Sequence, residues 1–314
     1  MGTGTMPEND LTTLDGALNW IRDEYPMIAG GLIGRKGAID NKSLVLAARV
    51  YALFINKVRG DISSIKDGLE SFAQMSFDFI KLQSRFMRVG HYEKDSAKEL
   101  LESLYDNPTR MEGFYLDGLL LTYSFWPNHV KLLCHYIDFL KGLTKEIKVM
   151  EIGVGHGLLA HLTFEELFPI DYTGLDISAS SVHYAQELWR ANGGEEFNAN
   201  LKVADATREG IDPSSFDLIL CCEVLEHVEE PSTVLKAINR SLKPDGKAFI
   251  TTVANIAAED HIYLFHDVEE IRGLCNDCGL TVIDDKLWAL GGGFEEMTPI
   301  PLNYSAVLVK TKGM

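Results

Sequence analysis

The hydrophobic pattern of the chain changes near Lys148, and this change restricts the fold more than any other feature. Before it, apolar residues recur every three or four positions, as in Leu44 to Val58 and Ile65 to Ile80, which is the period of helices with one buried face. After it, short apolar runs alternate with segments long enough for helices. A parallel sheet with crossover helices requires this alternation, so the sequence predicts a doubly wound α/β domain behind an all-α region.

The apolar runs of the second half predict a seven-stranded, Rossmann-like sheet. They are VMEI, YTGLDI, LKVA, FDLILC, KAFITTV, LTVIDD and YSAVLVKT. No helix-length segment separates the last two runs, so we expect the last two strands to pair with each other at one edge of the sheet, with the last strand antiparallel. We place a helical cap at residues 7–145 and the α/β domain at residues 146–314. A turn is predicted at Lys243 to Gly246, and Pro127 should end or kink the apolar helix that begins near Met111.

Charge and composition limit the classes of partner. The 314 residues include 29 Lys and Arg against 46 Asp and Glu, a formal net charge of −17, and residues 151–314 hold 27 acidic and 11 basic side chains. Such a chain repels nucleic acid and anionic lipid, so we expect neither as a partner. The longest apolar stretch, Leu44 to Ile55, is shorter than the roughly 20 residues of a membrane span. A homodimer remains open.

Cysteine usage and the N-terminus bear on the compartment. Five cysteines in a chain of this length do not form a disulfide framework, and no secretory leader is evident. The expected location is therefore the reducing cytoplasm. Residues 1–6 are interpreted as an expression remnant that is not part of the predicted fold.

A glycine-rich turn follows the first predicted strand, with the sequence Glu151-Ile-Gly153-Val-Gly155-His-Gly157. Glycines are needed where the backbone turns tightly and where a cofactor approaches closer than a Cβ permits. The dinucleotide-binding fingerprint places its third glycine where this chain has Leu158, and here the strand ends in an acid. The spacing favours a different cofactor, with the next helix beginning at about Leu158.

Acidic residues also end the next three strands. Asp176 follows the second strand, Asp205 the third and Glu223 the fourth, so all should lie at the carboxyl edge of the sheet. A carboxylate after the second strand is placed to accept two hydrogen bonds from a ribose diol. Any one of these acids alone has an alternative role as a helix cap or turn residue. Together, and in this order, they indicate a nucleoside-containing ligand.

Residues 147–255 resemble the core of class I S-adenosylmethionine (SAM)-dependent methyltransferases of the bacterial small-molecule type with an N-terminal helical cap. The resemblance rests on the glycine turn, the acids after the strands and the segment FDLILCCEVLEHV at 216–228. It implies SAM as cofactor, S-adenosylhomocysteine as product, and contacts to the methionine part, the ribose and the adenine. The residues matching these contacts are Glu151, Gly153, Gly155, Gly157, Asp176, Ile177, Asp205, Ala206, Cys222 and Glu223. An acidic pocket also suits the sulfonium cation of SAM, whereas it would repel a pyrophosphate.

Two histidines are the candidate bases. His227 leaves the sheet at its carboxyl edge, and His261 lies in the loop after the fifth strand. Either could instead hold a loop in place. Glu223, Glu226 and His227 also resemble part of the magnesium site of some RNA-end and quinone methyltransferases. Because no clear second histidine stands at the matching place, we expect no metal.

Four further residues are candidate acceptor contacts: Arg35, Tyr123, Asn128 and Tyr263. Arg35 stands in a glycine-rich segment that reads as a hinge or as a lid closing over a substrate carboxylate. Tyr123 and Asn128 lie in a segment resembling the helical cap of methyltransferases that modify amino acids and keto acids. Tyr263 either walls the acceptor pocket or packs its loop against the core.

These features predict methyl transfer from SAM to a small polar metabolite. The specific expectation is an amino-acid-like acceptor, through S-methylation of methionine or through N-methylation. A hydroxyl or ammonium acceptor would need a base, whereas a thioether would not. The alternatives are O- or C-methylation of a larger natural product, and a catalytically silent SAM-binding subunit that supports a partner.

Overall fold

The structure is a computed structural model, and it describes residues 10–31, 39–92, 107–144, 146–168, 170–208, 212–291 and 294–311. Its first part, which we call the helical region, consists of α-helices and one π-helical turn. These are α1 (Leu14–Glu24), α2 (Pro26–Gly31), α3 (Asn41–Lys57), α4 (Ile62–Val89), α6 (Pro108–Arg110), η2 (Met111–Tyr115), α7 (Leu116–Phe125) and α8 (Pro127–Lys141). Among the described residues, no helix is both long and apolar enough to cross a membrane.

The second part is a sheet flanked by helices, as predicted. Its strands are β1 (Lys148–Ile152), β2 (Asp171–Asp176), β3 (Ala199–Val203), β4 (Phe216–Cys222), β5 (Leu242–Ala254), β6 (Leu280–Ala289) and β7 (Leu302–Lys310). Its helices are α9 (Leu158–Leu167), α10 (Ala179–Ala191), α11 (Pro231–Ser241) and α12 (Val268–Asp277), with short 3₁₀ turns η3 (Gly194–Glu196), η4 (Leu225–His227) and η5 (Phe294–Glu296). Within the described ranges the sheet has seven strands in the order β3-β2-β1-β4-β5-β7-β6.

The strand directions confirm the predicted topology in all but one detail. β7 is antiparallel to both β5 and β6, whereas β1 to β5 pair in parallel. The exception is the turn predicted at Lys243 to Gly246, which the structure includes within β5. There the register moves from the pair Phe216 and Leu242 to the pair Leu218 and Lys247. Four residues, 243–246, therefore lie opposite Asp217 alone, and the predicted turn residues form an irregularity inside the bounds of β5.

Local sequence signals explain where the helices that frame the site begin and end. The Asp61 side chain accepts a hydrogen bond from the Ser64 backbone N–H and caps α4, which ends at Gly90 in a left-handed conformation. Trp126 is extended because proline disfavours a helical conformation in the residue before it. Pro127 then starts α8, so the predicted break between two helices is confirmed.

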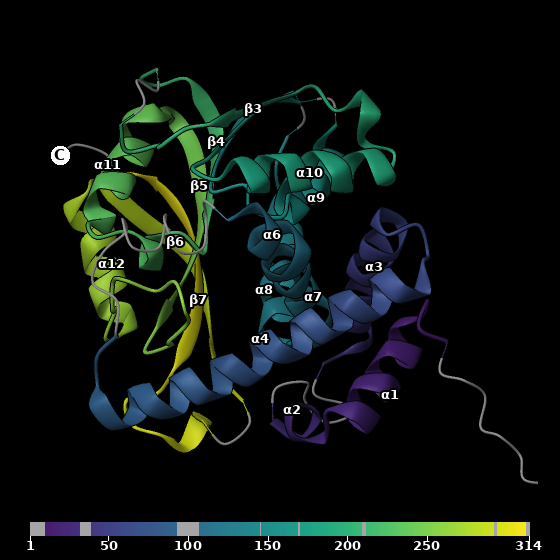
Figure 1. Cartoon of the computed structure of the whole chain (residues 1–314). Helices are drawn as coiled ribbons and strands as arrows, with labels where there is room; N and C mark the ends of the chain where they lie inside the picture. Colours follow the sequence, from purple (N-terminus) through teal and green to yellow (C-terminus); the bar gives the residue numbers. More distant parts are fainter. Residues whose placement is uncertain are drawn as a thin grey trace, which may run out of the picture.

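The helices cover both faces of the sheet. Figure 1 shows α11 and α12 on one side and the helical region with α9 and α10 on the other. The rings of Tyr136 and Phe139 in α8 pack against Phe249 of β5 at centroid distances of 5.0 and 5.3 Å. The helical region therefore shares a hydrophobic core with one face of the sheet. The division between residues 145 and 146 remains an interpretation of the sequence.

Candidate functional site

A cavity of about 950 Å³ lies between the carboxyl edge of the sheet and the helical region. On the sheet side it is lined by residues that follow β1, β2, β3 and β4. On the other side it is lined by residues of α4, η2, α7 and α8. Open α/β sheets bind their ligands at this edge, and the volume is near the upper end of the roughly 300–1,000 Å³ found for small-molecule sites.

The glycine turn after β1 approaches the cavity closely. Gly153 and Gly155 both have positive φ angles, of 77° and 53°, and both line the cavity. A Cβ on Gly153 would lie 2.5 Å from the Val224 side chain, whereas the corresponding position on Gly155 meets no atom within 4 Å. The backbone at Gly155 is thus open on its cavity side, as close approach of a cofactor requires.

Gly157 has a different place from the one predicted. It is absent from the cavity lining, and a Cβ there would lie 2.6 Å from the Cβ of Ala185 in α10. Its carbonyl oxygen accepts a hydrogen bond of 2.9 Å from Trp189 Nε1. Gly157 therefore packs the turn against α10, and its predicted contact with the cofactor stays a prediction.

Asp176 joins the end of β2 to the glycine turn. Its carboxylate accepts hydrogen bonds of 2.8 Å from the backbone N–H groups of Gly155 and Ser178. Burial raises the pKa of Asp176, and these hydrogen bonds oppose that rise. The carboxylate lines the cavity with acceptor capacity left over. The geometry thus places it as the predicted ribose contact requires.

The remaining predicted cofactor residues of the sheet edge also line the cavity. Ile177, Ala206 and Cys222 do so with small or apolar surfaces. Asp205 accepts hydrogen bonds from the Thr207 N–H and hydroxyl, at 2.9 and 2.6 Å. Their roles toward adenine and ribose stay predictions.

Two buried carboxyl groups flank the place where the sulfonium is expected. Glu151 accepts a hydrogen bond from the Tyr172 hydroxyl, and burial raises the pKa of Glu151 to about 8 although this hydrogen bond opposes the rise. Burial, followed by the charge of Glu226, raises the pKa of Glu223 to about 8. Among the residues that the structure describes, Glu223 Oε1 has no hydrogen-bond partner. A cation in the cavity would stabilise the ionised form of both groups.

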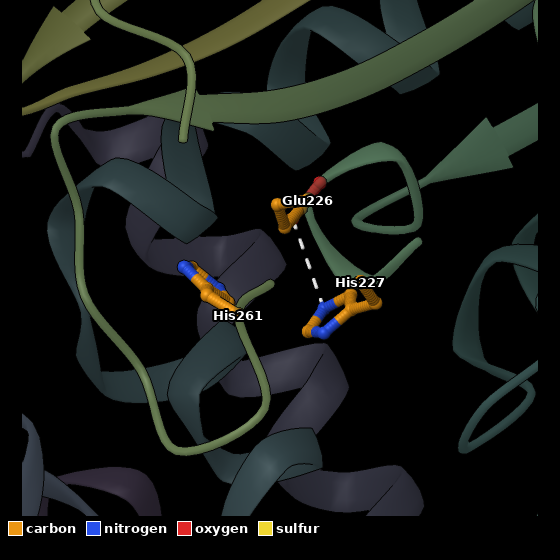
Figure 2. Close-up of side chains that lie close together, drawn as sticks. All are labelled: Glu226, His227 and His261. Carbon is orange, nitrogen blue, oxygen red and sulfur yellow. Dashed lines mark ion pairs between the residues drawn. The ribbon is translucent and has the colours of Figure 1, made fainter. Parts of the chain in front are cut away.

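Glu226, His227 and His261 form a buried cluster beside the cavity (Figure 2). Glu226 is fully buried, and its Oε2 accepts a hydrogen bond of 2.7 Å from Thr252. Its Oε1 has no hydrogen-bond partner among the described residues and lies 3.9 Å from His227 Nε2, the pair joined by the dashed line in Figure 2. The two imidazole rings lie 5.0 Å apart. The cluster combines η4 with the loop after β5, segments that are more than 30 residues apart in the sequence.

Backbone carbonyls fix which nitrogen of each histidine faces the cluster. His227 Nδ1 lies 2.8 Å from the Asp260 carbonyl oxygen, and His261 Nδ1 lies 2.7 Å from the Ile256 carbonyl oxygen. A carbonyl only accepts, so each Nδ1 carries the hydrogen and, in the neutral ring, each Nε2 is left as an acceptor. Burial lowers the pKa of both rings, but for His227 the carboxylates of Asp260 and Glu226 outweigh burial and raise the pKa.

The cluster also bears on metal binding, which was not expected from the sequence. One ligand atom from each of Glu226, His227 and His261 lies within 4.8 Å of the others. His261 thus supplies a second histidine beside Glu226 and His227. A carboxylate oxygen without a hydrogen-bond donor among the described residues, next to imidazoles whose other nitrogens bind carbonyls, is a donor set that fits a divalent cation.

The opposite wall of the cavity is mainly apolar and comes from the helical region. Phe79 of α4 packs against Trp126 at a centroid distance of 5.1 Å, and both line the cavity. Tyr123 of α7 also lines it, with its ring 4.8 Å from His129. Burial lowers the pKa of His129 to about 4, so this histidine is neutral and does not offset the acids opposite.

The other predicted acceptor contacts differ in their positions relative to the cavity. Asn128 lines the cavity, but its Nδ2 donates hydrogen bonds of 3.0 Å to the Ala289 carbonyl and to Asn303 Oδ1. Tyr263 is not among the described lining residues; its hydroxyl donates to Glu270 at 3.3 Å and its ring packs on Phe265, which favours the loop-packing alternative over the pocket wall. Arg35 and its glycine-rich segment lie outside the described residues.

Several residues of the site were not predicted. Asp260 and Trp126 had weak signals, because Asp260 precedes a candidate histidine and Trp126 precedes Pro127. Phe79 and Gln83 had no such signal. The sequence of α4 has the pattern of an ordinary amphipathic helix, which does not specify what the helix packs against.

Comparisons with known proteins agree with this geometry. Residues 150–248 match the family described as a methyltransferase domain. Ubiquinone biosynthesis O-methyltransferase from Idiomarina loihiensis is 35% identical over 106 residues, which are 34% of this chain and 42% of the relative. The enzyme of the same name from Pseudomonas fluorescens is 33% identical over 122 residues, which are 39% and 50%. The chain thus spans half or less of the length of these relatives.

Solved structures share the fold at low identity. A phosphoethanolamine N-methyltransferase from Haemonchus contortus, in complex with SAM, has a TM-score of 0.52 and 17% identity, covering 70% of this chain and 61% of that one. The cyclase SpnF has a TM-score of 0.51 and 16% identity, covering 60% and 83%. Similarity at this level shows the fold, and the fold hosts more than one activity. The matched sequence, the sheet order and the cavity at its carboxyl edge together show that the chain carries a methyltransferase domain of the class I, SAM-dependent type.

Proposed function

We propose that the protein transfers the methyl group of SAM to a hydroxyl oxygen of a small, uncharged and largely apolar acceptor. The observation that carries the proposal is a single cavity in which the acidic cofactor edge and His227 face a wall formed by Phe79, Tyr123 and Trp126. The sequence match to relatives named as O-methyltransferases supports oxygen as the acceptor atom.

The charge of the cavity argues against an amino-acid acceptor. The acidic residues that line it are Asp78, Glu151, Asp176, Asp205, Glu223, Glu259 and Asp260. Among the described lining residues, Lys131 is the one lysine or arginine. The acids that are ionised would repel a free carboxylate on the acceptor, and the described lining residues offer that carboxylate no bidentate partner. The proposal therefore takes up the alternative of a larger apolar acceptor in place of methionine or another amino acid.

In this proposal His227 accepts the proton that the acceptor loses. Its Nδ1–H donates to the Asp260 carbonyl, and the Asp260 carboxylate lies 3.5 Å from the same nitrogen, where it stabilises an imidazolium. The hydroxyl oxygen attacks the methyl carbon, the C–S bond breaks with its electron pair going to sulfur, and the hydroxyl proton goes to His227 Nε2. The products are the methyl ether and S-adenosylhomocysteine.

The cation site allows a second use of the same residues. Glu226, His227 and His261 would hold a divalent cation, which would polarise the acceptor hydroxyl and lower its pKa. His227 would then be a ligand and could not also take the proton through Nε2. Removal of metal distinguishes the two uses.

The silent-subunit alternative is disfavoured by the cavity itself. Its mark would be a blocked acceptor space beside intact cofactor residues. The cavity instead extends without interruption from the glycine turn to Trp126.

The proposal is tested by an acceptor panel with methyl-labelled SAM. The panel contains phenols and catechols with apolar substituents, primary amines, and free amino acids including methionine. We expect label in a phenol or catechol at a rate at least about tenfold above that of any amino acid, because an unpaired carboxylate in an acidic site costs binding energy. Label recovered mainly in an amino acid or amine would contradict the proposal.

Two controls sharpen this result. Lys131→Met should leave phenol methylation within about threefold, whereas it would abolish turnover of an acceptor held through its carboxylate. Dialysis against EDTA should leave the rate unchanged when His227 acts as the base. A loss that is restored by Mg²⁺ or Mn²⁺ would instead assign Glu226, His227 and His261 as metal ligands.

A further inference from the structure

The loop after β5, residues 255–266, carries both Asp260 and His261, and the helical region holds this loop through specific hydrogen bonds. Gln83 of α4 is fully buried. Its Nε2 donates to the Asn255 carbonyl at 2.9 Å, and its Oε1 accepts from the Ala257 N–H at 2.8 Å. One side-chain amide therefore binds the backbone on both sides of Ile256, in the way that a neighbouring strand would.

The residue between these two bonds connects directly to the buried cluster. The Ile256 carbonyl accepts hydrogen bonds from His261 Nδ1 at 2.7 Å and from the Tyr92 hydroxyl at 2.6 Å. The Tyr92 ring also lies edge-on to His261 at a centroid distance of 5.8 Å. The position and tautomer of the His261 imidazole thus depend on a peptide segment that Gln83 fixes.

A second set of contacts holds the same loop from η2 and its neighbourhood. The Tyr115 hydroxyl donates to the Asp260 carboxylate, and Arg110 pairs with Glu259. Asn255, at the start of the loop, has a left-handed φ of 57°, and its side-chain amide donates to the His266 carbonyl at 2.7 Å. A non-glycine residue in this conformation is strained and persists when its surroundings hold it, and Gln83 supplies part of that support.

We infer that Gln83 is a positioning residue, which sets the geometry of His261 and Asp260 around His227 by clamping the backbone of residues 255–257 to α4. This inference rests on the proposed function, because it assigns the helical region a part in the reaction beyond covering the cavity. Gln83 is not among the described residues that line the cavity. Its effect should therefore reach turnover and leave SAM binding intact.

The test replaces Gln83 with methionine, which has a similar length and can make neither hydrogen bond. We expect kcat to fall about a hundredfold, the loss that a displacement of about 1 Å causes in a catalytic constellation, with the dissociation constant of SAM within about threefold. The ¹⁵N imidazole signals of histidine-labelled protein, assigned through His261→Asn, should show a shifted His261 resonance. The NMR signals and the SAM dissociation constant are measured without an acceptor. They therefore test the role of Gln83 even if the proposed function is wrong.

A matched control exists on the far side of the helical region. Asn192, after α10, donates its amide to the Leu53 carbonyl at 3.0 Å and accepts from Asn56 at 2.9 Å, so it also ties the helical region to the α/β part. Asn192→Leu should leave both the His261 signal and kcat unchanged. An equal fall in kcat for both variants would show a general loosening and would overturn the inference.

A milder variant keeps the inference testable where Gln83→Met fails to fold. Tyr92→Phe removes only the hydroxyl that shares the Ile256 carbonyl with His261. It should shift the His261 resonance and lower kcat about threefold to tenfold. An unshifted His261 signal together with unchanged turnover in this variant, or in Gln83→Met, would overturn the assignment of the clamp.

Discussion

Replacing His227 with glutamine is expected to lower kcat by about a hundredfold or more, with the affinity for SAM within about threefold of the original. Glutamine has a similar size and can still donate to the Asp260 carbonyl, but it has no nitrogen that accepts a proton at neutral pH. Steady-state kinetics with the best acceptor of the panel, together with calorimetry of SAM binding, measure the two quantities.

The control for this variant is His266→Gln, because His266 is an exposed histidine of the same loop and does not line the cavity. It should keep full turnover. If His227→Gln and His261→Gln both keep near-full turnover, the acceptor loses no proton in the reaction. A sulfur nucleophile would then replace the hydroxyl, and the proposed acceptor class would be wrong.

Replacing Asp176 with alanine is expected to weaken SAM binding at least about tenfold, and the structure gives two reasons for this. The ribose hydroxyls would lose their carboxylate acceptor. The two charge-assisted hydrogen bonds lost contribute about a few kcal/mol to the binding free energy. The N–H groups of Gly155 and Ser178 would also lose their 2.8 Å partner, so the glycine turn would be less well fixed. Asp176→Asn should lose less, because its amide oxygen still accepts one of these bonds.

Asp171→Asn is the control for the cofactor effect, since Asp171 is exposed at the opposite end of the same strand. Calorimetry should show unchanged SAM affinity for this control, and thermal unfolding should show that the Asp176 variants remain folded. Unchanged affinity in Asp176→Ala would remove this carboxylate from the cofactor site.

The sheet and its cofactor edge were predictable because they depend on order along the chain. A parallel strand ends at the same edge as its neighbours, so a residue that follows a strand is placed by position alone. Asp176, Asp205 and Glu223 reach the cavity for this reason. The packing of Gly157 against Ala185 was not predictable in the same way. A glycine required for close approach to a cofactor and a glycine required for packing against a helix look alike in a sequence.

The acceptor side was less predictable, because it depends on contacts between elements that are distant in the sequence. His261 meets Glu226 and His227 only through the path of the loop after β5, and that path is set by Gln83 of α4. Tyr263 is two residues further along the same loop and turns away toward Glu270. Helix periodicity shows which face of α4 is buried, but it does not show against what.

We expect one cavity to hold SAM against the sheet edge and the acceptor against the helical region. A crystal structure of the protein with S-adenosylhomocysteine and the acceptor identified by the panel tests this arrangement most directly. The ribose hydroxyls should lie within hydrogen-bond distance of Asp176, the sulfur beside Glu223, and the acceptor hydroxyl between that sulfur and His227, with the apolar part of the acceptor against Phe79 and Trp126. Cofactor bound away from the glycine turn, or an acceptor bound outside this cavity, would show that the proposed arrangement is wrong.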